Sequence, residues 1–219
     1  MSDDLGVLFQ AIERDIDIAF AKWPGGYPGN IELALLDAVL SIRARYGTWP
    51  VSGVGKRVLA YRELRGISEL ASSPCDDLAV LAAFDTGSLK KVCGHQKIAG
   101  VPKVDVIQTG ARALVDAGVR HAADLQATNE DHKKAYTSVR GLGPVTWSYF
   151  GMLLGTSDVK ADTMIVRYVS RQLRRVVESG EARRMLLLVA ERLRQEPRAL
   201  DHAVWRFERD PNNRRRELS

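Results

Sequence analysis

The segment that decides the fold is VRGLGPVTWSYFGMLLGTSDVKADTMIVRY, which runs from Val139 to Tyr168. Its pattern predicts a helix, a tight glycine-rich hairpin, a second helix, and a third helix that begins at Asp162. The GLGP motif at 141–144 cannot continue a helix, because glycine favours left-handed conformations and proline lacks an N–H donor. Pro144 suits the first turn of the next helix, whose unpaired backbone N–H groups can bind an anion. The segment therefore offers a phosphate-sized anion site and, 19 residues after Gly143, a carboxylate.

Both features also have an ordinary structural explanation. The GLGP turn is either a simple connection between packed helices or a clamp on a nucleic-acid backbone, which positions the nucleic acid without reading its sequence. Asp162 is a good N-cap for the helix that follows it. An Asp at a helix N-terminus also tends to stay ionised, and an ionised carboxylate would stabilise a developing oxocarbenium ion. The residues alone leave these alternatives open.

Length and composition set broad limits. The chain has 219 residues with 32 Lys and Arg against 27 Asp and Glu, a net charge of +5. This balance is compatible with nucleic acid and equally with a solvated surface. The N-terminus is acidic and amphipathic, unlike a signal peptide, and no uncharged run reaches membrane-spanning length. We therefore expect a cytoplasmic monomer (nucleoid-associated if the source is a bacterium) with no membrane partner.

Helical periodicity runs along the whole chain, and convincing alternating strands are absent. We expect an all-α domain of about ten helices. Residues 211–219 are expected to form a polar basic tail. Lys103 begins a predicted helix at 102–117, where it would contact phosphate or face solvent. The helix after Asp162 is expected to reach Val177 and to carry three arginines on one face: Arg167, Arg171 and Arg174. This face is either a basic stripe beside DNA or an ordinary solvated face.

Residues 139–168 resemble the helix-hairpin-helix/Gly-Pro-Asp (HhH-GPD) superfamily of base-excision DNA glycosylases. The hairpin matches at 141–143, the next helix at 144–154 and the acid at Asp162. More loosely, residues 100–118 and 33–47 resemble helices that precede the hairpin, so the likeness covers about two thirds of the chain. The resemblance implies a two-lobed helix-hairpin-helix glycosylase architecture, in which residues 1–210 form a single domain with a cleft between its two lobes. It also implies double-stranded DNA as the partner.

The resemblance also assigns roles to residues. Asp162 becomes the catalytic acid, which stabilises the sugar cation or orients the attacking water. The hairpin becomes the site that binds the DNA backbone, together with a possible backbone-held monovalent cation, and Pro144 only shapes its turn. The residues assigned to backbone contact are Gly141, Leu142, Gly143, Val145 and Thr146.

The chain departs from the family pattern at positions that exclude some of the reactions and cofactors found in the family. Bifunctional members carry a lysine two residues after the second hairpin glycine, where this chain has Val145, so we predict no lyase activity and water as the nucleophile. The two cysteines, Cys75 and Cys93, lack zinc-site spacing, and none follows them, so neither a side-chain metal site nor a four-cysteine iron–sulfur cluster is expected. No cofactor is predicted.

The stretch GLGPVTWSYF is most similar to the monofunctional alkylpurine-type branch of the family. Trp147 and Tyr149 either stack on a flipped base or pack in the core. Arg43 and Tyr46 end an early buried helix, where the family places the side chain that fills the vacated stack; a charged helix end is the alternative. The predicted function is that of a monofunctional DNA glycosylase. The alternatives are a non-catalytic nucleic-acid-binding module that retains the hairpin and, more weakly, a helical protein–protein scaffold.

Overall fold

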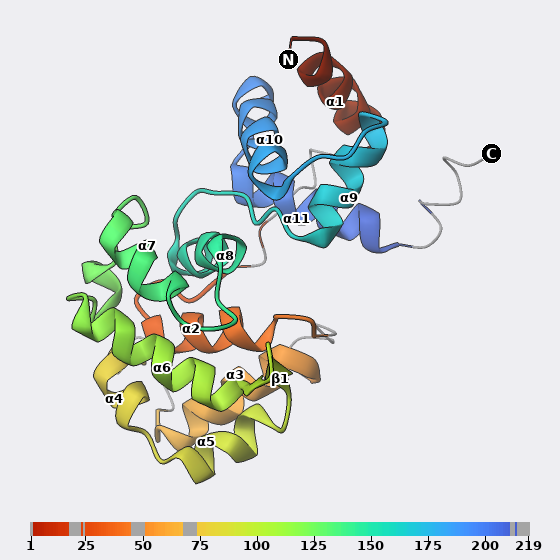
Figure 1. The fold of residues 1–219 in the computed structure, drawn as a ribbon. Coiled ribbons are helices and arrows are strands. Elements are labelled where there is room, and N and C mark those ends of the chain that lie inside the picture. Colours follow the sequence, from red (N-terminus) through yellow and green to blue (C-terminus); the bar gives the residue numbers. More distant parts are fainter. Residues whose placement is uncertain are drawn as a thin grey trace. The chain divides into compact units, whose positions relative to one another are not determined.

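The computed structural model describes residues 2–17, 23, 25–44, 51–67, 74–210 and 213. These residues form an all-α structure, as predicted (Figure 1). None of the helices found in them is long and apolar enough to cross a membrane. The α-helices are α1 (Ser2–Asp15), α2 (Ile31–Leu40), α3 (Gly53–Leu64), α4 (Leu78–Ala83), α5 (Thr86–Cys93), α6 (Lys103–Asp116), α7 (Glu130–Thr137), α8 (Pro144–Leu154), α9 (Thr163–Gln172), α10 (Ser179–Leu193) and α11 (Pro197–Arg209). The short elements are β1 (Lys97–Ile98), β2 (Val101–Pro102) and a 3₁₀ turn (Ala122–Asp124).

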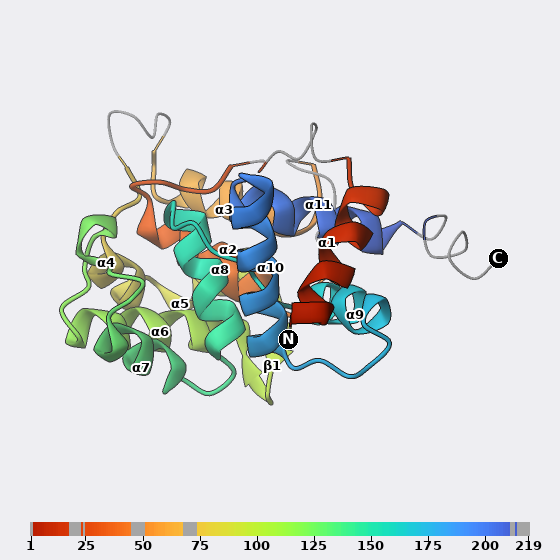
Figure 2. The same cartoon turned by 90° about the horizontal axis from the view of Figure 1, so that it is seen from above.

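The chain forms two compact units, and it returns to the first after building the second. Unit 1 comprises residues 1–25 and 157–219, and unit 2 comprises residues 26–156. In unit 1, α1 lies beside α9 and α10, which follow it by more than a hundred residues (Figures 1 and 2). The hairpin at 141–144 belongs to unit 2, whereas Asp162 belongs to unit 1.

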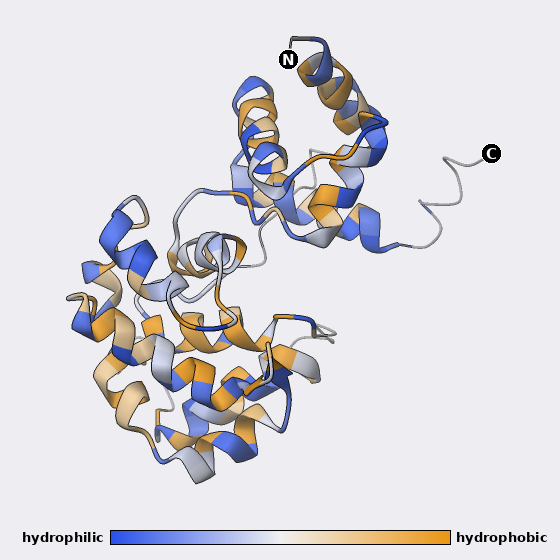
Figure 3. Cartoon of the chain, in the orientation of Figure 1, coloured by the Kyte–Doolittle hydropathy of each residue, from blue (hydrophilic) through white to orange (hydrophobic). Residues whose placement is uncertain are grey.

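Amphipathic helices build the core of unit 1. An apolar stripe of α1, continued by Ile16 just after the helix, is buried at Leu8 and Ile12. It packs with apolar residues of α9, α10 and α11, for example Tyr168 and Leu186. Polar positions of the same helices stay outside, so α1 and α10 show alternating hydrophobic and hydrophilic patches (Figure 3).

Helix α2 is the centre of unit 2. All ten of its residues are buried, and it packs against α3, α6 and α8. Its apolar sequence explains this position, because a helix that is hydrophobic on every side needs neighbours on every side. The sequence pattern predicted that this helix ends at Tyr46, but α2 ends at Leu40 and a turn follows. Tyr46 lies outside the described residues.

A small antiparallel hairpin joins α5 to α6. Its strands β1 and β2 have two residues each, and Ala99 and Gly100 between them both have positive φ (50° and 86°). Such a turn suits a two-residue hairpin loop. The sequence analysis missed the hairpin, because two residues are too few for an alternating pattern. Its buried Ile98 packs beneath the GLGP turn, where a Cβ added at Gly141 would lie 2.6 Å from Ile98 Cγ2.

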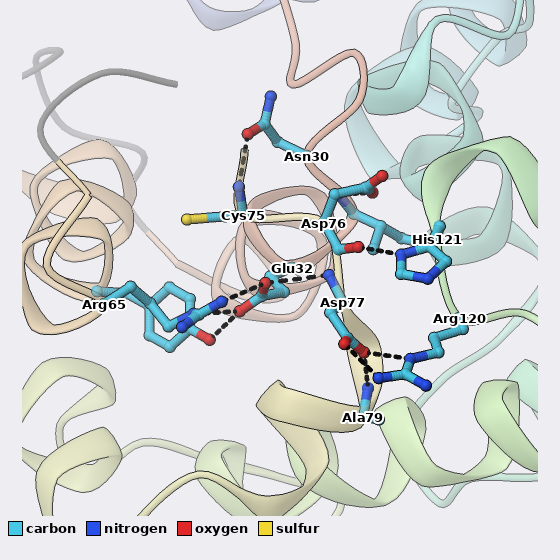
Figure 4. A network of polar contacts seen from close by, with 11 residues as sticks. Asn30, Glu32, Arg65, Cys75, Asp76, Asp77, Ala79, Arg120 and His121 are labelled. Carbon is cyan, nitrogen blue, oxygen red and sulfur yellow. Dashed lines mark hydrogen bonds and ion pairs between the residues drawn. The ribbon is translucent and has the colours of Figure 1, made fainter. Parts of the chain in front are cut away.

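A polar network ties α2 and α3 of unit 2 to the segment before α4 (Figure 4). Glu32 of α2 is fully buried and accepts hydrogen bonds from the Tyr61 hydroxyl, from the Arg65 guanidinium (Nε to Oε2, 2.9 Å) and from the Asp77 N–H (3.1 Å). Burial, and then the charge of Glu32, raise the pKa of Tyr61. Asp77 in turn pairs with Arg120 at 2.7 Å. The buried charge is therefore paired on several sides.

Candidate functional site

The GLGP turn is closed by its own backbone and by packing on α6. Gly141 has φ 98°, a conformation that glycine adopts without strain. The Leu142 N–H donates to the Val139 carbonyl at 2.9 Å, and the Leu142 side chain is buried. It lies against Gly110 of α6, where an added Cβ would be 3.4 Å from Leu142 Cδ1. The hairpin therefore has a fixed shape within unit 2.

The backbone N–H groups of the hairpin divide into two sets. Gly143 donates to Thr146 Oγ1 at 2.9 Å, and that hydroxyl donates back to the Gly143 carbonyl at 2.8 Å. Leu142 and Gly143 thus use their N–H groups inside the turn. Gly141, Val145 and Thr146 have N–H groups with no acceptor among the described residues. Of the five residues predicted to contact a DNA backbone, three therefore have a donor available, and the contact itself stays a prediction.

Both aromatic candidates of α8 are buried in unit 2. The Trp147 ring packs with Tyr136 and Phe150, and its Nε1–H donates to the Ala127 carbonyl at 3.2 Å. The Tyr149 hydroxyl donates to Asp37 at 3.0 Å. These contacts describe core packing, and stacking on a flipped base stays a prediction for both rings.

Asp37 is a buried acid that the sequence analysis did not single out. It lies on α2 and accepts hydrogen bonds from the hydroxyls of Tyr27 (2.8 Å) and Tyr149 (3.0 Å). The available signal was a lone acid inside the apolar run LALLDAVL. A buried carboxyl needs such partners, because an unpaired one would be costly.

The prediction that Lys103 contacts phosphate or faces solvent is wrong. Lys103 neither faces solvent nor is available to a phosphate: its side chain is buried. Its ammonium group donates to the carbonyls of Leu40 (2.7 Å) and Ile42 (2.8 Å) and to Gln96 Oε1 (2.9 Å). Burial, with a smaller contribution from Arg57, lowers the pKa of Lys103 to about 8. Lys103 thereby binds the carbonyls at the end of α2.

Arg43 lies in the turn that Lys103 binds. Its side chain is exposed, and its φ of 51° is uncommon for a residue other than glycine. An exposed side chain at this position is compatible with the role of a wedge, the side chain that would fill the stack vacated by a flipped base. The wedge role stays a prediction for Arg43, and the structure adds nothing on Tyr46.

In unit 1, Asp162 is the N-cap of α9. Its Oδ1 accepts hydrogen bonds from the N–H groups of Met164 (2.8 Å) and Ile165 (3.3 Å), which confirms the capping role. Its other oxygen, Oδ2, has no hydrogen-bond partner among the described residues. The side chain is half-buried. The local sequence thus fixes one carboxyl oxygen, and the catalytic role of Asp162 stays a prediction.

The loop before Asp162 is bound by residues far along the chain. The Lys160 N–H donates to Asp201 of α11 at 3.0 Å, and the Ala161 carbonyl accepts from the Ser179 hydroxyl at 2.8 Å. Burial, and then the charge of Asp162, raise the pKa of Asp201 well above its usual range, while Lys160 opposes the shift. The sequence analysis missed Asp201, because an acid within an amphipathic helix gives no signal of its own.

The predicted end of the helix after Asp162 is wrong, and one of its three expected arginines lies outside the helix. Helix α9 ends at Gln172 rather than at Val177, and Arg174 lies beyond it with φ 52°. Arg171 and Arg167 do share a face, but they lie 2.8 Å and 3.8 Å from the buried carboxylate of Glu208. The stripe is therefore interrupted and partly neutralised.

The described residues show no group of three or more His, Cys, Asp or Glu side chains that could bind a metal ion. Cys75 and Cys93 are both buried and unbridged. Burial raises the pKa of the Cys75 thiol to about 11 and that of the Cys93 thiol to about 12. These thiols are core residues.

Comparison with known proteins gives a family and a fold. Residues 7–209 match the family described as "Domain of unknown function (DUF8548)", so the chain belongs to this family. No curated protein matches the sequence. The structure is similar to that of Schizosaccharomyces pombe 3-methyladenine DNA glycosylase (Mag1), solved in complex with abasic DNA, with a TM-score of 0.59 and 16% identity over 96% of this chain and 98% of that chain. At this identity the likeness shows the fold: the chain has a helix-hairpin-helix DNA glycosylase fold.

Proposed function

We propose that this member of the DUF8548 family is a monofunctional DNA glycosylase that flips a damaged or modified base and hydrolyses its N-glycosidic bond. The observation that carries the proposal is the fold shared along nearly the whole of both chains with a glycosylase solved on abasic DNA, the product of base removal. The hairpin and Asp162 add groups of the right chemistry. The proposed place of action is cytoplasmic DNA.

In the proposed reaction, Asp162 acts through its Oδ2. The two N–H groups at the start of α9 fix Oδ1, so the second oxygen can face the sugar of the flipped nucleotide. As the C1′–N bond breaks, the base leaves with the bonding electrons, and the carboxylate stabilises the positive charge on the sugar. Water then adds to C1′ and loses its proton. Val145 stands where a nucleophilic lysine would be needed, so no Schiff base forms.

The hairpin is proposed to bind the DNA backbone without reading sequence. The N–H groups of Gly141, Val145 and Thr146 lie at the N-terminus of α8, where the helix dipole also favours an anion. The carbonyls of Gly141 and Leu142 accept no hydrogen bond from the described residues, so they suit a monovalent cation at the turn.

Gly143 supports the proposed contact in a separate way. Its φ of −149° is open to any residue, and a Cβ added there would meet nothing within 4 Å. The fold therefore does not require glycine at this position. Close approach of a DNA backbone would require it, because a side chain would stand between the turn and the phosphate.

A non-catalytic nucleic-acid-binding module is the second candidate. The observation in its favour is that Trp147 and Tyr149 are buried and bonded inside unit 2. With both rings engaged, the hairpin could bind DNA without a base-stacking platform on α8.

Base release from defined duplexes separates the two. We expect wild type to release at least one base from a panel of alkylated, deaminated and oxidised duplexes, and Asp162→Asn to slow single-turnover release about 100-fold or more. Glu191→Gln, a carboxyl-to-amide change at an exposed position of α10, is the matched control. Release by Asp162→Asn at the wild-type rate would overturn the catalytic assignment. Salt-sensitive duplex binding without any release would establish the binding module.

A further inference from the structure

We propose that Asp201 is a positioning residue for Asp162: its buried carboxyl binds the Lys160 peptide and thereby fixes the turn from which Asp162 projects. This inference rests on the proposed function, since it concerns the placement of the proposed catalytic acid. It assigns a role to a residue of α11 that lies 41 residues beyond Lys160 in the sequence.

The geometry connects the two acids through the backbone of one residue, Lys160. Asp201 Oδ1 accepts the Lys160 N–H at 3.0 Å. On the other side of that residue, the Lys160 carbonyl accepts the Asp162 N–H at 2.6 Å. Both polar groups of the Lys160 backbone are therefore used, one toward α11 and one toward Asp162. Any movement of the Lys160 backbone would move Asp162.

Neighbouring groups restrict the same loop. Val159 and Ala161 are buried in the core of unit 1, on either side of Lys160. The Ser179 hydroxyl donates to the Ala161 carbonyl at 2.8 Å, and Asp158 pairs with Arg183 at 2.6 Å. To these contacts Asp201 adds an anchor on Lys160, the residue whose carbonyl accepts the Asp162 N–H.

The charges around Asp201 suit a neutral carboxylic acid. Burial and the nearby charges of Asp162 and Asp158 raise the pKa of Asp201, whereas Lys160 lowers it. A protonated Asp201 can still accept the Lys160 N–H at Oδ1, with its proton on Oδ2. In this protonated form it would hold the loop without placing a second negative charge beside Asp162, which like-charge repulsion would oppose.

The raised pKa of Asp201 has a consequence for stability. The unfolded chain loses this proton near the ordinary pKa of Asp, about 3.9, whereas the folded chain retains it to higher pH. The folded state then binds more protons, so the contribution of Asp201 to stability falls as the pH rises through that window. Asp201→Asn, which stays neutral, should remove this fall.

The test compares two substitutions of Asp201 in the full-length chain. Asp201→Asn retains an oxygen acceptor for the Lys160 N–H, and Asp201→Ala removes it; Glu191→Gln serves as the control on α10. Three quantities are measured for each: the single-turnover rate of base release, the Kd for the same duplex, and the hydrogen-exchange rate of the Lys160 amide.

We expect Asp201→Ala to slow base release about 100-fold, because a displacement of the order of 1 Å at a catalytic group has such an effect. Its duplex Kd should stay within about twofold of wild type, a change worth less than ~0.5 kcal/mol, since the hairpin is untouched. Exchange of the Lys160 amide should accelerate about tenfold or more, as expected when a protecting hydrogen bond is lost. Asp201→Asn should release base within about threefold of the wild-type rate, because its amide oxygen replaces the acceptor.

Several results would overturn the proposal. Base release by Asp201→Ala at the wild-type rate would show that the anchor is dispensable. A loss in Asp201→Asn as large as that in Asp201→Ala would show that the charge of Asp201, and not its hydrogen bond, is required. Equal losses of rate and duplex affinity in Asp201→Ala would indicate general unfolding instead of positioning.

Failure of the proposed function gives a different pattern. If wild type releases no base from any duplex, the glycosylase proposal fails, and the amide-exchange comparison still decides whether Asp201 binds the loop. If Asp201→Ala does not fold, Asp201→Asn remains informative, since neutral Asn must preserve both the Lys160 amide protection and the rate. An exchange rate of the Lys160 amide that neither substitution alters would overturn the anchor.

Discussion

The two units hold their candidate functional groups in different ways. In unit 2 the hairpin presents backbone N–H groups, and its closing bonds join residues only three positions apart, such as Gly143 and Thr146. In unit 1 the candidate group is the side chain of Asp162, and its loop is bound by Ser179 and Asp201, which lie 18 and 41 residues beyond the atoms that they bind.

The difference shows where a motif is sufficient and where it is not. A backbone turn is set by the conformational preferences of consecutive residues, so it can be recognised from sequence and tolerates change elsewhere. A side chain on a loop is placed by whatever packs around that loop. In unit 2 a third kind of interaction contributes: buried, paired charges join the helices of the unit that contains the turn. The predictions below test these distinctions.

The largest effect is expected from breaking the buried charge network of unit 2. Glu32→Ala removes the partner of Arg65, Tyr61 and the Asp77 N–H, and should lower the unfolding free energy by about 3–5 kcal/mol. Denaturant unfolding measures this loss. Glu130→Ala, which breaks an exposed pair with Lys133, should cost no more than ~0.5 kcal/mol. Similar losses in the two variants would contradict the view that unit 2 depends on buried charge.

The hairpin offers two glycines with opposite requirements. Gly141→Ala forces an alanine to φ 98° and a Cβ to within 2.6 Å of Ile98, and should cost about 3 kcal/mol. Gly143→Ala meets nothing and should change stability by less than ~0.5 kcal/mol.

The same pair separates folding from binding. Although Gly143→Ala is stable, it should weaken duplex affinity about tenfold, the equivalent of one lost phosphate hydrogen bond. Gly6→Ala, another glycine with open space around it, is the control for affinity. Unchanged duplex binding by Gly143→Ala would remove the support that this glycine gives to the phosphate contact.

The stability of the protein should depend on pH through the buried side chain of Lys103. Because the pKa of folded Lys103 is about 8, against about 10.5 when unfolded, the unfolded chain binds more protons between these values. Stability should therefore rise by about 2–3 kcal/mol between pH 8 and pH 10.5 through this group. Denaturant midpoints across this range measure the rise. Lys103→Met should abolish it, whereas exposed Lys97→Met should retain it; a rise that persists in Lys103→Met would assign it to another group.

The smallest expected effect on stability separates the capping role of Asp162 from its proposed catalytic role. Asp162→Ala should lower stability by about 1 kcal/mol, because the first turn of α9 loses its cap. Asp162→Asn should be close to neutral in thermal unfolding, since asparagine caps as well as aspartate. If Asp162→Asn were as unstable as Asp162→Ala, its loss of activity could no longer be separated from folding.

Several features of the fold could be predicted from the sequence, and two predictions about side-chain burial and helix length were wrong. The helix predicted at 144–154 is observed as α8, and the capping role of Asp162 is confirmed. Lys103 was expected at the surface, but the residues that bury it include Leu40, 63 positions earlier. The helix after Asp162 was expected to continue to Val177, and a local turn ends it sooner. Arg174 ends that helix region in a left-handed turn, and the Val177 N–H binds the Ser170 hydroxyl instead.

By itself, the sequence determined that the chain is helical, where the GLGP turn lies, and which acid caps α9. Glycine, proline and aspartate act on the backbone within a few residues of themselves. Tertiary structure alone decided that Lys103 is buried at the end of α2, that Asp37 lies between two tyrosines, and that Asp201 binds the loop before Asp162. Burial and pairing depend on which elements pack together, and the spacing of residues in one chain does not encode that directly.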